Sequence, residues 1–206
     1  LQISSAVFSS SAVWEWTLSS CWVDFQPSMP FTLSSGSATQ ASDYRIIKNL
    51  HITHVVNATA NCPDAFPNTL SYLSLRLTDD AQQDLVEALP LASRFIDAAL
   101  KADPAGRVLV HCSMGRSRSS ALTLAFLMEH RRWSLLHALR WLKERRACSA
   151  PNLNFLSQLM TYEELLFGKT LLVNTVEVLS SRGVDLHSFL QEELNSPNEL
   201  WNLKIT

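Results

Sequence analysis

The sequence predicts an α/β fold with a central, mainly parallel, twisted sheet that is flanked by helices on both faces. Short apolar segments typical of buried strands alternate along the chain with longer segments whose apolar residues recur at helical spacing. This alternation is typical of parallel sheets, because each helix carries the chain back across the sheet between two strands. The 206 residues suffice for one domain of ordinary size with additional segments.

Four segments have the pattern of strands. The first is short and is expected at the edge of the sheet, the third alternates apolar and polar side chains, and the fourth is apolar almost throughout. In chain order the four predicted strands are residues 31–33, 54–58, 72–77 and 107–111.

Five segments are predicted as helices from apolar residues at helical spacing. The predicted helices are residues 39–50, residues 85–101, a segment that leaves the 112–118 loop and continues through Met128, residues 135–146 and residues 152–167. Thr39 or Ser42 is expected to cap the first helix, Asp84 the second and Ser134 the fourth, since their side chains accept hydrogen bonds from free backbone N–H groups.

The two ends of the chain lack the regular pattern of the centre. Residues 1–30 are rich in serine, contain three tryptophans and show no periodicity, so an irregular N-terminal arm is predicted there. Residues 31–168 are predicted to form the domain. Residues 169–206 form a C-terminal extension, in which residues 184–194 have the pattern of one amphipathic helix.

Composition excludes several classes of function. A formal net charge of −2 provides no basic surface for nucleic acid, and no apolar run approaches the length of a membrane span. The four cysteines lack the spacing of a zinc site or of a disulfide framework, so no metal and no other cofactor are expected. A reducing compartment is favoured, and residues 1–20 lack the basic start of a signal peptide. We therefore expect a cytoplasmic protein, with the nucleus as an additional candidate compartment.

The segment between the predicted strand at 107–111 and the helix that follows has the chemistry of an anion site. Backbone N–H groups of a tight loop and of the first helical turn converge there, and the helix dipole adds partial positive charge. Cys112 begins this loop, so its thiol pKa is expected to be lowered. Arg118 ends the loop and offers a planar fork of donors for two phosphate oxygens. The loop residues are Cys112, Ser113, Met114, Gly115, Arg116, Ser117 and Arg118.

The order of residues around the loop resembles the catalytic loop of the cysteine-dependent protein phosphatases. The pattern is His-Cys, five residues and Arg-Ser, from His111 to Ser119. Residues 125–128, Ala-Phe-Leu-Met, resemble the Ala-Tyr-Leu-Met run of the dual-specificity phosphatases. A third matching motif in the last helix consists of Pro151, Asn152, Phe155, Gln158, Leu159, Tyr162 and Glu163. The resemblance covers about residues 31–167 and implies the cysteine-phosphatase fold.

The resemblance also implies a reaction and a set of roles. Cys112 would attack the phosphorus atom, while Arg118 and the loop from Ser113 to Ser117 bind the phosphate oxygens. Ser119 would donate a hydrogen bond to the Cys112 sulfur and make it a better leaving group. The family's general acid stands five residues before an Asp or Asn and six before an apolar residue, which matches Asp79, with Asp80 as the alternative. His111 either hydrogen-bonds the loop or is a satisfied core histidine.

The resemblance favours phosphotyrosine together with phosphoserine or phosphothreonine in proteins, with a phosphorylated protein kinase among the candidate partners. Ser113 and Met114 stand where many lipid-directed relatives have a lysine beside the cysteine, which also favours a protein substrate. Phosphoinositides, RNA 5′ ends and phosphorylated glucans remain alternatives, as does a phosphoprotein-binding scaffold with little turnover. The basic cluster Arg140, Lys143, Arg145 and Arg146 is expected on a solvated face, or to supply an arginine for a second substrate phosphate.

Overall fold

The structure is a computed structural model that describes residues 23–24, 32–102 and 104–168. Within these residues the chain forms one five-stranded sheet in the order β1-β2-β5-β3-β4. The strands are β1 (Val23–Asp24), β2 (Thr32–Ser37), β3 (His54–Asn57), β4 (Ser71–Ser74) and β5 (Arg107–Cys112). Neighbouring strands from β2 to β4 run parallel, and β1 alone is antiparallel. The prediction of a mainly parallel sheet is confirmed.

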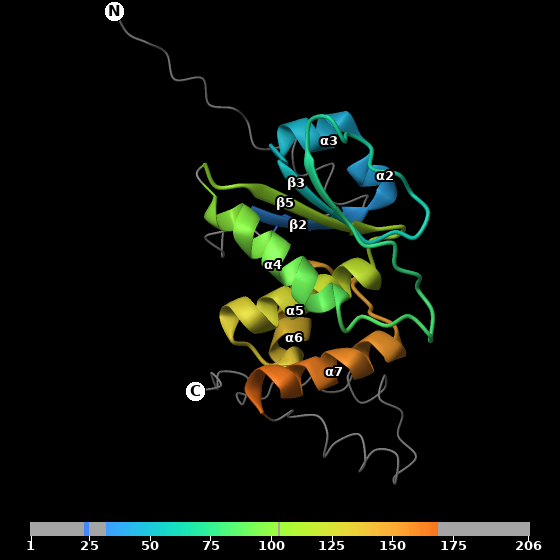
Figure 1. Cartoon of the computed structure of the whole chain (residues 1–206), viewed down its shortest axis with the longest axis vertical. Helices are drawn as coiled ribbons and strands as arrows, with labels where there is room; N and C mark the ends of the chain where they lie inside the picture. The colour runs from blue at the N-terminus through green and yellow to red at the C-terminus, as the bar shows by residue number, and fades with distance from the viewer. Residues whose placement is uncertain (1–22, 25–31, 103, 169–206) are drawn as a thin grey trace, which may run out of the picture.

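Helices cover both faces of this sheet (Figure 1). They are α2 (Ala38–Ala41), α3 (Tyr44–Asn49), α4 (Ala88–Lys101), α5 (Arg118–Arg131), α6 (Leu135–Arg145) and α7 (Leu153–Phe167). On one face, Ala41 and Ile47 from the two short helices pack with Val55 and Leu109 of the sheet. On the other face α4 and α5 contact the sheet, and α6 and α7 pack against α5.

Helix α5 occupies the centre of the larger core. Every residue from Arg118 to Met128 is buried, because the sheet, α4, α6 and α7 surround the helix. This burial explains why the segment is apolar almost all round instead of amphipathic. Since β5 is also buried, the loop between β5 and α5 is held between two rigid elements of the core.

The first predicted helix is two helices. Residues 39–50 were expected to form one helix capped by Thr39 or Ser42, and both expectations are wrong. Ser37 caps α2, and Asp43 caps α3 by accepting the Arg45 backbone N–H at 2.9 Å. Asp43 takes an extended conformation, with ψ 107°, in order to make this bond, so the helix is interrupted there.

Other boundaries moved by a few residues. The first strand was expected at 31–33 on the edge, but β2 continues to Ser37 and pairs with β1 at Ser34 and Ser35. The strand expected at 72–77 is β4, which already ends at Ser74. The helix expected from residue 85 is α4, which begins at Ala88, and Asp84 accepts the Val86 N–H at 2.8 Å in the preceding turn.

The predictions for β3, β5, α5, α6 and α7 agree with the structure to within one or two residues, whereas residues 23–24 of the arm predicted as irregular form β1. Ser134 caps α6 as predicted, accepting the His137 N–H at 3.2 Å. The predicted C-terminal helix at 184–194, and the predicted arm apart from β1, lie outside the described residues. No helix in the described part of the chain is long and apolar enough to cross a membrane.

Candidate active site

The loop from Ser113 to Ser117 connects the C-terminal end of β5 to the N-terminus of α5. The neighbouring parallel strands β2 and β3 end at the same edge of the sheet and support the loop from both sides. The Ala38 N–H donates to the Ser113 carbonyl at 3.2 Å, and the Ala58 N–H donates to the His111 carbonyl at 2.9 Å. The predicted sequence of strand, loop and helix is therefore present, at the edge where open α/β sheets bind ligands.

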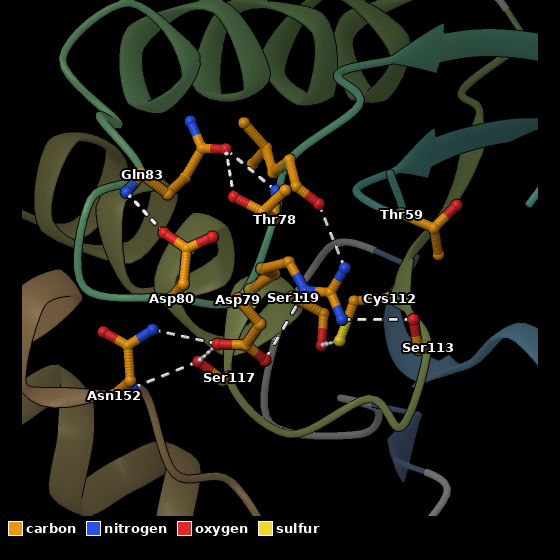
Figure 2. Close-up of polar contacts among 12 residues, drawn as sticks. Thr59, Thr78, Asp79, Asp80, Gln83, Cys112, Ser113, Ser117, Ser119 and Asn152 are labelled. Atoms are coloured by element: carbon orange, nitrogen blue, oxygen red, sulfur yellow. Dashed lines mark hydrogen bonds and ion pairs between the residues drawn. The ribbon is translucent and has the colours of Figure 1, made fainter. Parts of the chain in front are cut away.

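Cys112 is buried at the base of the loop, with 1% of its surface exposed. Its sulfur lies 3.5 Å from the Ser119 hydroxyl oxygen (Figure 2). Burial alone raises the pKa of the Cys112 thiol. Stabilisation of the thiolate outweighs burial, and the pKa is lowered. The stabilising groups are the Ser119 side chain, the Ser119 and Arg116 backbone N–H groups and the charge of Arg118. The thiolate, which is the nucleophilic form of cysteine, is thus favoured.

The Arg118 guanidinium is buried and held by its two terminal nitrogens. Nη1 donates to the Leu77 carbonyl at 3.0 Å, and Nη2 donates to the Ser113 hydroxyl at 3.1 Å. Nε lies 3.5 Å from Asp79 Oδ2. These contacts hold the guanidinium beside the loop that carries Cys112.

Asp79 connects the β4–α4 segment to the loop. Its Oδ1 accepts hydrogen bonds from Ser117 Oγ at 2.7 Å and from Asn152 Nδ2 at 2.9 Å. Because its side chain remains 33% exposed, Asp79 lies at the mouth of the site, where a substrate can reach it.

Asp80 lies in the turn that follows and has different partners. Its Oδ1 accepts the backbone N–H groups of Gln82 and Gln83, both at 2.9 Å. Hydrogen bonding, first from the Thr78 side chain and then from these N–H groups, lowers the pKa of Asp80. Figure 2 shows Asp80 beside Gln83, whereas Asp79 lies beside Ser117 and Asn152. Of the two aspartates, the contact to Arg118 beside the loop is thus made by Asp79.

A model of the dual specificity phosphatase catalytic domain matches residues 34–165 of the chain. The chain belongs to the dual specificity phosphatase family. It is 38% identical to human dual specificity protein phosphatase 1 over 135 residues, and 37% identical to Drosophila melanogaster protein phosphatase Slingshot over 131 residues. These matches cover 66% and 64% of this chain but only 36% and 12% of the two relatives.

A solved structure of human DUSP28 has a similar fold. The TM-score is 0.62 at 34% sequence identity, and the match covers 68% of this chain and 93% of that chain. The predicted family and the cysteine-phosphatase fold are both confirmed.

The side chains between Ser113 and Ser117 have partners within the protein or are exposed. Met114 is 67% exposed, and the Arg116 Nε donates to the Cys148 carbonyl at 3.3 Å. Ser113 and Ser117 are engaged with Arg118 and Asp79. We therefore expect any anion bound at this loop to be held by backbone N–H groups and the Arg118 guanidinium.

Two residues near the loop, Asn152 and Arg146, make contacts with the site that the sequence did not indicate. Asn152 was expected to hold structure, and it caps α7, but its side chain also donates to Asp79. Arg146 was expected on a solvated face. It is instead 2% exposed and donates from Nε and Nη2 to the Gly115 carbonyl at 3.0 and 2.6 Å. The sequence does not indicate that Arg146 is buried, because this residue follows the last turn of α6, where the helical spacing of apolar residues no longer applies.

Two other arginines of that cluster, Arg140 and Arg145, are half-buried and have partners on α6 itself. Arg140 pairs with Glu144 at 3.3 Å, and the Arg145 guanidinium lies 4.0 Å from the centre of the Trp141 ring. The expectation of a solvated basic face is thus wrong for Arg146 alone among the arginines of the cluster.

His111 is buried on β5 next to Cys112, with 4% of its surface exposed. Burial lowers its pKa to about 4, so the ring is neutral at pH 7. No group of three or more His, Cys, Asp or Glu side chains among the described residues is arranged to hold a metal ion.

Proposed function

We propose that residues 31–168 form a phosphatase unit that hydrolyses phosphotyrosine and phosphoserine or phosphothreonine in proteins through a cysteinyl-phosphate intermediate. The observation that carries the proposal is the meeting of three groups at one loop. The buried Cys112 sulfur, whose thiol pKa is lowered, lies at the base of the loop, and Arg118 and Asp79 are in contact beside it. These are the nucleophile, the phosphate-binding cation and the proton donor of such a reaction.

In the first step the Cys112 thiolate attacks phosphorus, the new S–P bond forms and the bond from phosphorus to the substrate oxygen breaks. Loop N–H groups and the Arg118 guanidinium stabilise the charge on the three equatorial oxygens. Asp79, protonated, donates its proton to the departing oxygen. Ser117 and Asn152, which hydrogen-bond Asp79 Oδ1, orient the carboxyl for this transfer.

In the second step a water molecule attacks the phosphorus of the intermediate and gives its proton to Asp79. The S–P bond breaks, and the sulfur leaves as a thiolate. The Ser119 hydroxyl, 3.5 Å from the sulfur, stabilises that thiolate by hydrogen bonding. Since the loop and Arg118 supply the positive field in both steps, we expect chelators to leave turnover unchanged.

Two observations support protein substrates. The curated relatives are named dual specificity protein phosphatase 1 and protein phosphatase Slingshot. The two residues directly after the nucleophile are Ser113 and Met114, so neither position beside the cysteine carries the extra cation that would suit a polyanionic lipid headgroup. We further propose a reducing compartment, the cytoplasm or the nucleus, because the Cys112 thiol must remain unoxidised.

Turnover of an aryl phosphate tests the reaction. Wild-type protein is expected to hydrolyse p-nitrophenyl phosphate, with inhibition by vanadate and no effect of EDTA. Cys112→Ser is expected to abolish turnover but to keep binding of inorganic phosphate, because the loop N–H groups and Arg118 stay in place. Cys62→Ser is the matched control, since Cys62 is a free, exposed cysteine outside the site. A Cys112→Ser protein that still turns over, or a wild type that does not, would contradict the proposal.

A substrate panel tests the specificity. Phosphotyrosine and phosphothreonine peptides, including doubly phosphorylated kinase activation loops, are compared with phosphoinositide vesicles at equal phosphate concentration. We expect kcat/KM to be highest for the peptides. Preferential hydrolysis of phosphoinositides would replace the proposed substrate class but keep the reaction.

A further inference from the structure

The connection between α6 and α7 lies along the outer side of the phosphate-binding loop. Arg146, directly after α6, donates two hydrogen bonds to the Gly115 carbonyl, at 3.0 and 2.6 Å. Four residues later the Ala150 N–H donates to the Arg116 carbonyl at 2.9 Å. Two consecutive carbonyls of the loop are thus held from outside by one short segment.

This contact determines which way one peptide group of the loop faces. The peptide bond between Gly115 and Arg116 is planar, and in the trans form its C=O and N–H point in opposite directions. Because Arg146 holds the carbonyl outward, the Arg116 N–H is directed inward. It is one of the groups whose hydrogen bonding lowers the pKa of Cys112.

The chain is closely packed on both sides of Gly115. Gly115 has φ +68°, a conformation that glycine adopts easily. A Cβ atom at Gly115 would lie 2.5 Å from Arg146 Nη2 and 2.5 Å from the Gly36 carbonyl group at the end of β2. The loop is therefore packed between a strand end and the Arg146 guanidinium, which are in contact with it on both sides.

We propose that Arg146 is a positioning residue of the active site: its guanidinium holds the Gly115 carbonyl outward so that the Arg116 N–H faces the Cys112 sulfur and a bound phosphoryl oxygen. The inference rests on the proposed function of this loop. Arg146 itself does not touch the reacting atoms, and acts through the peptide between Gly115 and Arg116. This role requires two donor nitrogens at one carbonyl, which an arginine side chain supplies and a lysine side chain does not.

The test measures the Cys112 thiol pKa, from the pH dependence of its alkylation by iodoacetamide, followed by mass spectrometry of the Cys112 peptide. Arg146→Gln and Arg146→Lys are compared with the wild type. Lys143→Gln is the matched control, because it removes one positive charge from α6 in the same cluster. The other charged and titratable groups around Cys112, namely Arg118, Asp79 and His111, are unchanged in all variants. Circular dichroism and thermal melting establish that each variant is folded.

In Arg146→Gln the thiol pKa is expected to rise by about one unit, which lowers the thiolate fraction about tenfold at a pH below the pKa. Binding of inorganic phosphate is expected to weaken, and the acidic limb of the kcat/KM profile should move to higher pH. Arg146→Lys should be intermediate, since one donor replaces two. Lys143→Gln should match the wild type.

A folded Arg146→Gln or Arg146→Lys protein with the wild-type alkylation profile would overturn the proposal, because a purely structural arginine lowers the melting temperature without changing the thiol. If Arg146→Gln does not fold, the Arg146→Lys profile decides alone. Alkylation needs no substrate, so absence of wild-type turnover would overturn the proposed function and leave this test of Arg146 intact.

Discussion

Replacement of Ser119 by alanine tests the electrostatics of the nucleophile at a single atom. The Ser119 side chain is fully buried, and its hydroxyl oxygen lies 3.5 Å from the Cys112 sulfur. The hydroxyl stabilises the thiolate and not the neutral thiol, so its bond lowers the pKa of Cys112. Ser119→Ala removes this bond and leaves the backbone N–H groups and Arg118 in place, so we expect the thiol pKa to rise.

The size of the effect follows from the contact. A hydrogen bond to a charged group contributes about 1.5–3 kcal/mol, and sulfur is a weak acceptor, so the long contact to Cys112 is expected to contribute about 1 kcal/mol. Divided by 1.36 kcal/mol per unit, this corresponds to a rise of about 0.7 in the thiol pKa. At a pH below that pKa the thiolate fraction then falls about fivefold.

Two assays measure this change. Alkylation of Cys112 by iodoacetamide as a function of pH gives the thiol pKa directly. Rapid-mixing kinetics with p-nitrophenyl phosphate separate formation of the phosphoenzyme from its hydrolysis. We expect Ser119→Ala to slow hydrolysis more than formation, because the sulfur is the leaving group only in the second step, so that a burst of nitrophenol appears.

Ser120 provides the matched control. It is the next residue of α5, is fully buried, and its hydroxyl is without a hydrogen-bond partner in the described part of the chain. Ser120→Ala therefore removes the same atom from the same helix without touching the sulfur. The reasoning is refuted if Ser119→Ala leaves the alkylation profile unchanged, or if Ser120→Ala shifts it equally.

Three further predictions follow from the other contacts of the site. Asp79→Asn should lower kcat about 100-fold or more on a phosphothreonine peptide, whose leaving group needs a proton, and much less on p-nitrophenyl phosphate. Asp80→Asn should leave both rates near wild type. The opposite result would exchange the roles of the two aspartates. Asn152→Ala removes the cap of α7 and a hydrogen bond to Asp79. The free energy of unfolding, measured by heat or urea, should fall by about 0.5–2 kcal/mol, and turnover of a peptide should fall more than turnover of an aryl phosphate. Equal losses on both substrates would argue against orientation of the acid by Asn152. Burial lowers the pKa of His111 from 6.5 to about 4, so below pH 6.5 the unfolded chain binds a proton that the folded protein does not. The free energy of unfolding should therefore fall by about 2 kcal/mol between pH 7 and pH 5. Urea titrations of His111→Gln should show a smaller fall, and an equal fall would assign the loss to other groups.

Much of the fold could be predicted because its signals are local. Apolar runs and helical spacing indicated β3, β5, α6 and α7 close to their observed positions, and Ser134 was identified as a cap from its place before an apolar segment. The break between α2 and α3 was missed. The side chain of Asp43 bonds the backbone two residues on, and this local competition outweighed the helical spacing of the apolar residues around it.

In the candidate site, too, the contiguous residues could be predicted and the contacts between distant residues could not. Residues 111–119 are contiguous, so their order alone indicated a nucleophile, a loop of backbone donors and a fork-shaped cation. Between the two aspartates, spacing matched Asp79 and kept Asp80 as the alternative. Contacts across the chain support this choice, since the Asp79 carboxylate meets Ser117 and Asn152, while the Asp80 carboxylate accepts N–H groups of its own turn.

Arg146 shows most clearly what the sequence could not predict. By itself the sequence determined that a cysteine and an arginine stand at the two ends of a short loop between a buried strand and a buried helix, because strand, loop and helix are encoded by neighbouring residues. Only the tertiary structure decided that an arginine 31 residues after Gly115 is buried against that loop. Periodicity describes which face of a helix is apolar, but the burial of a charged group depends on whether a distant part of the chain presents a carbonyl to receive it.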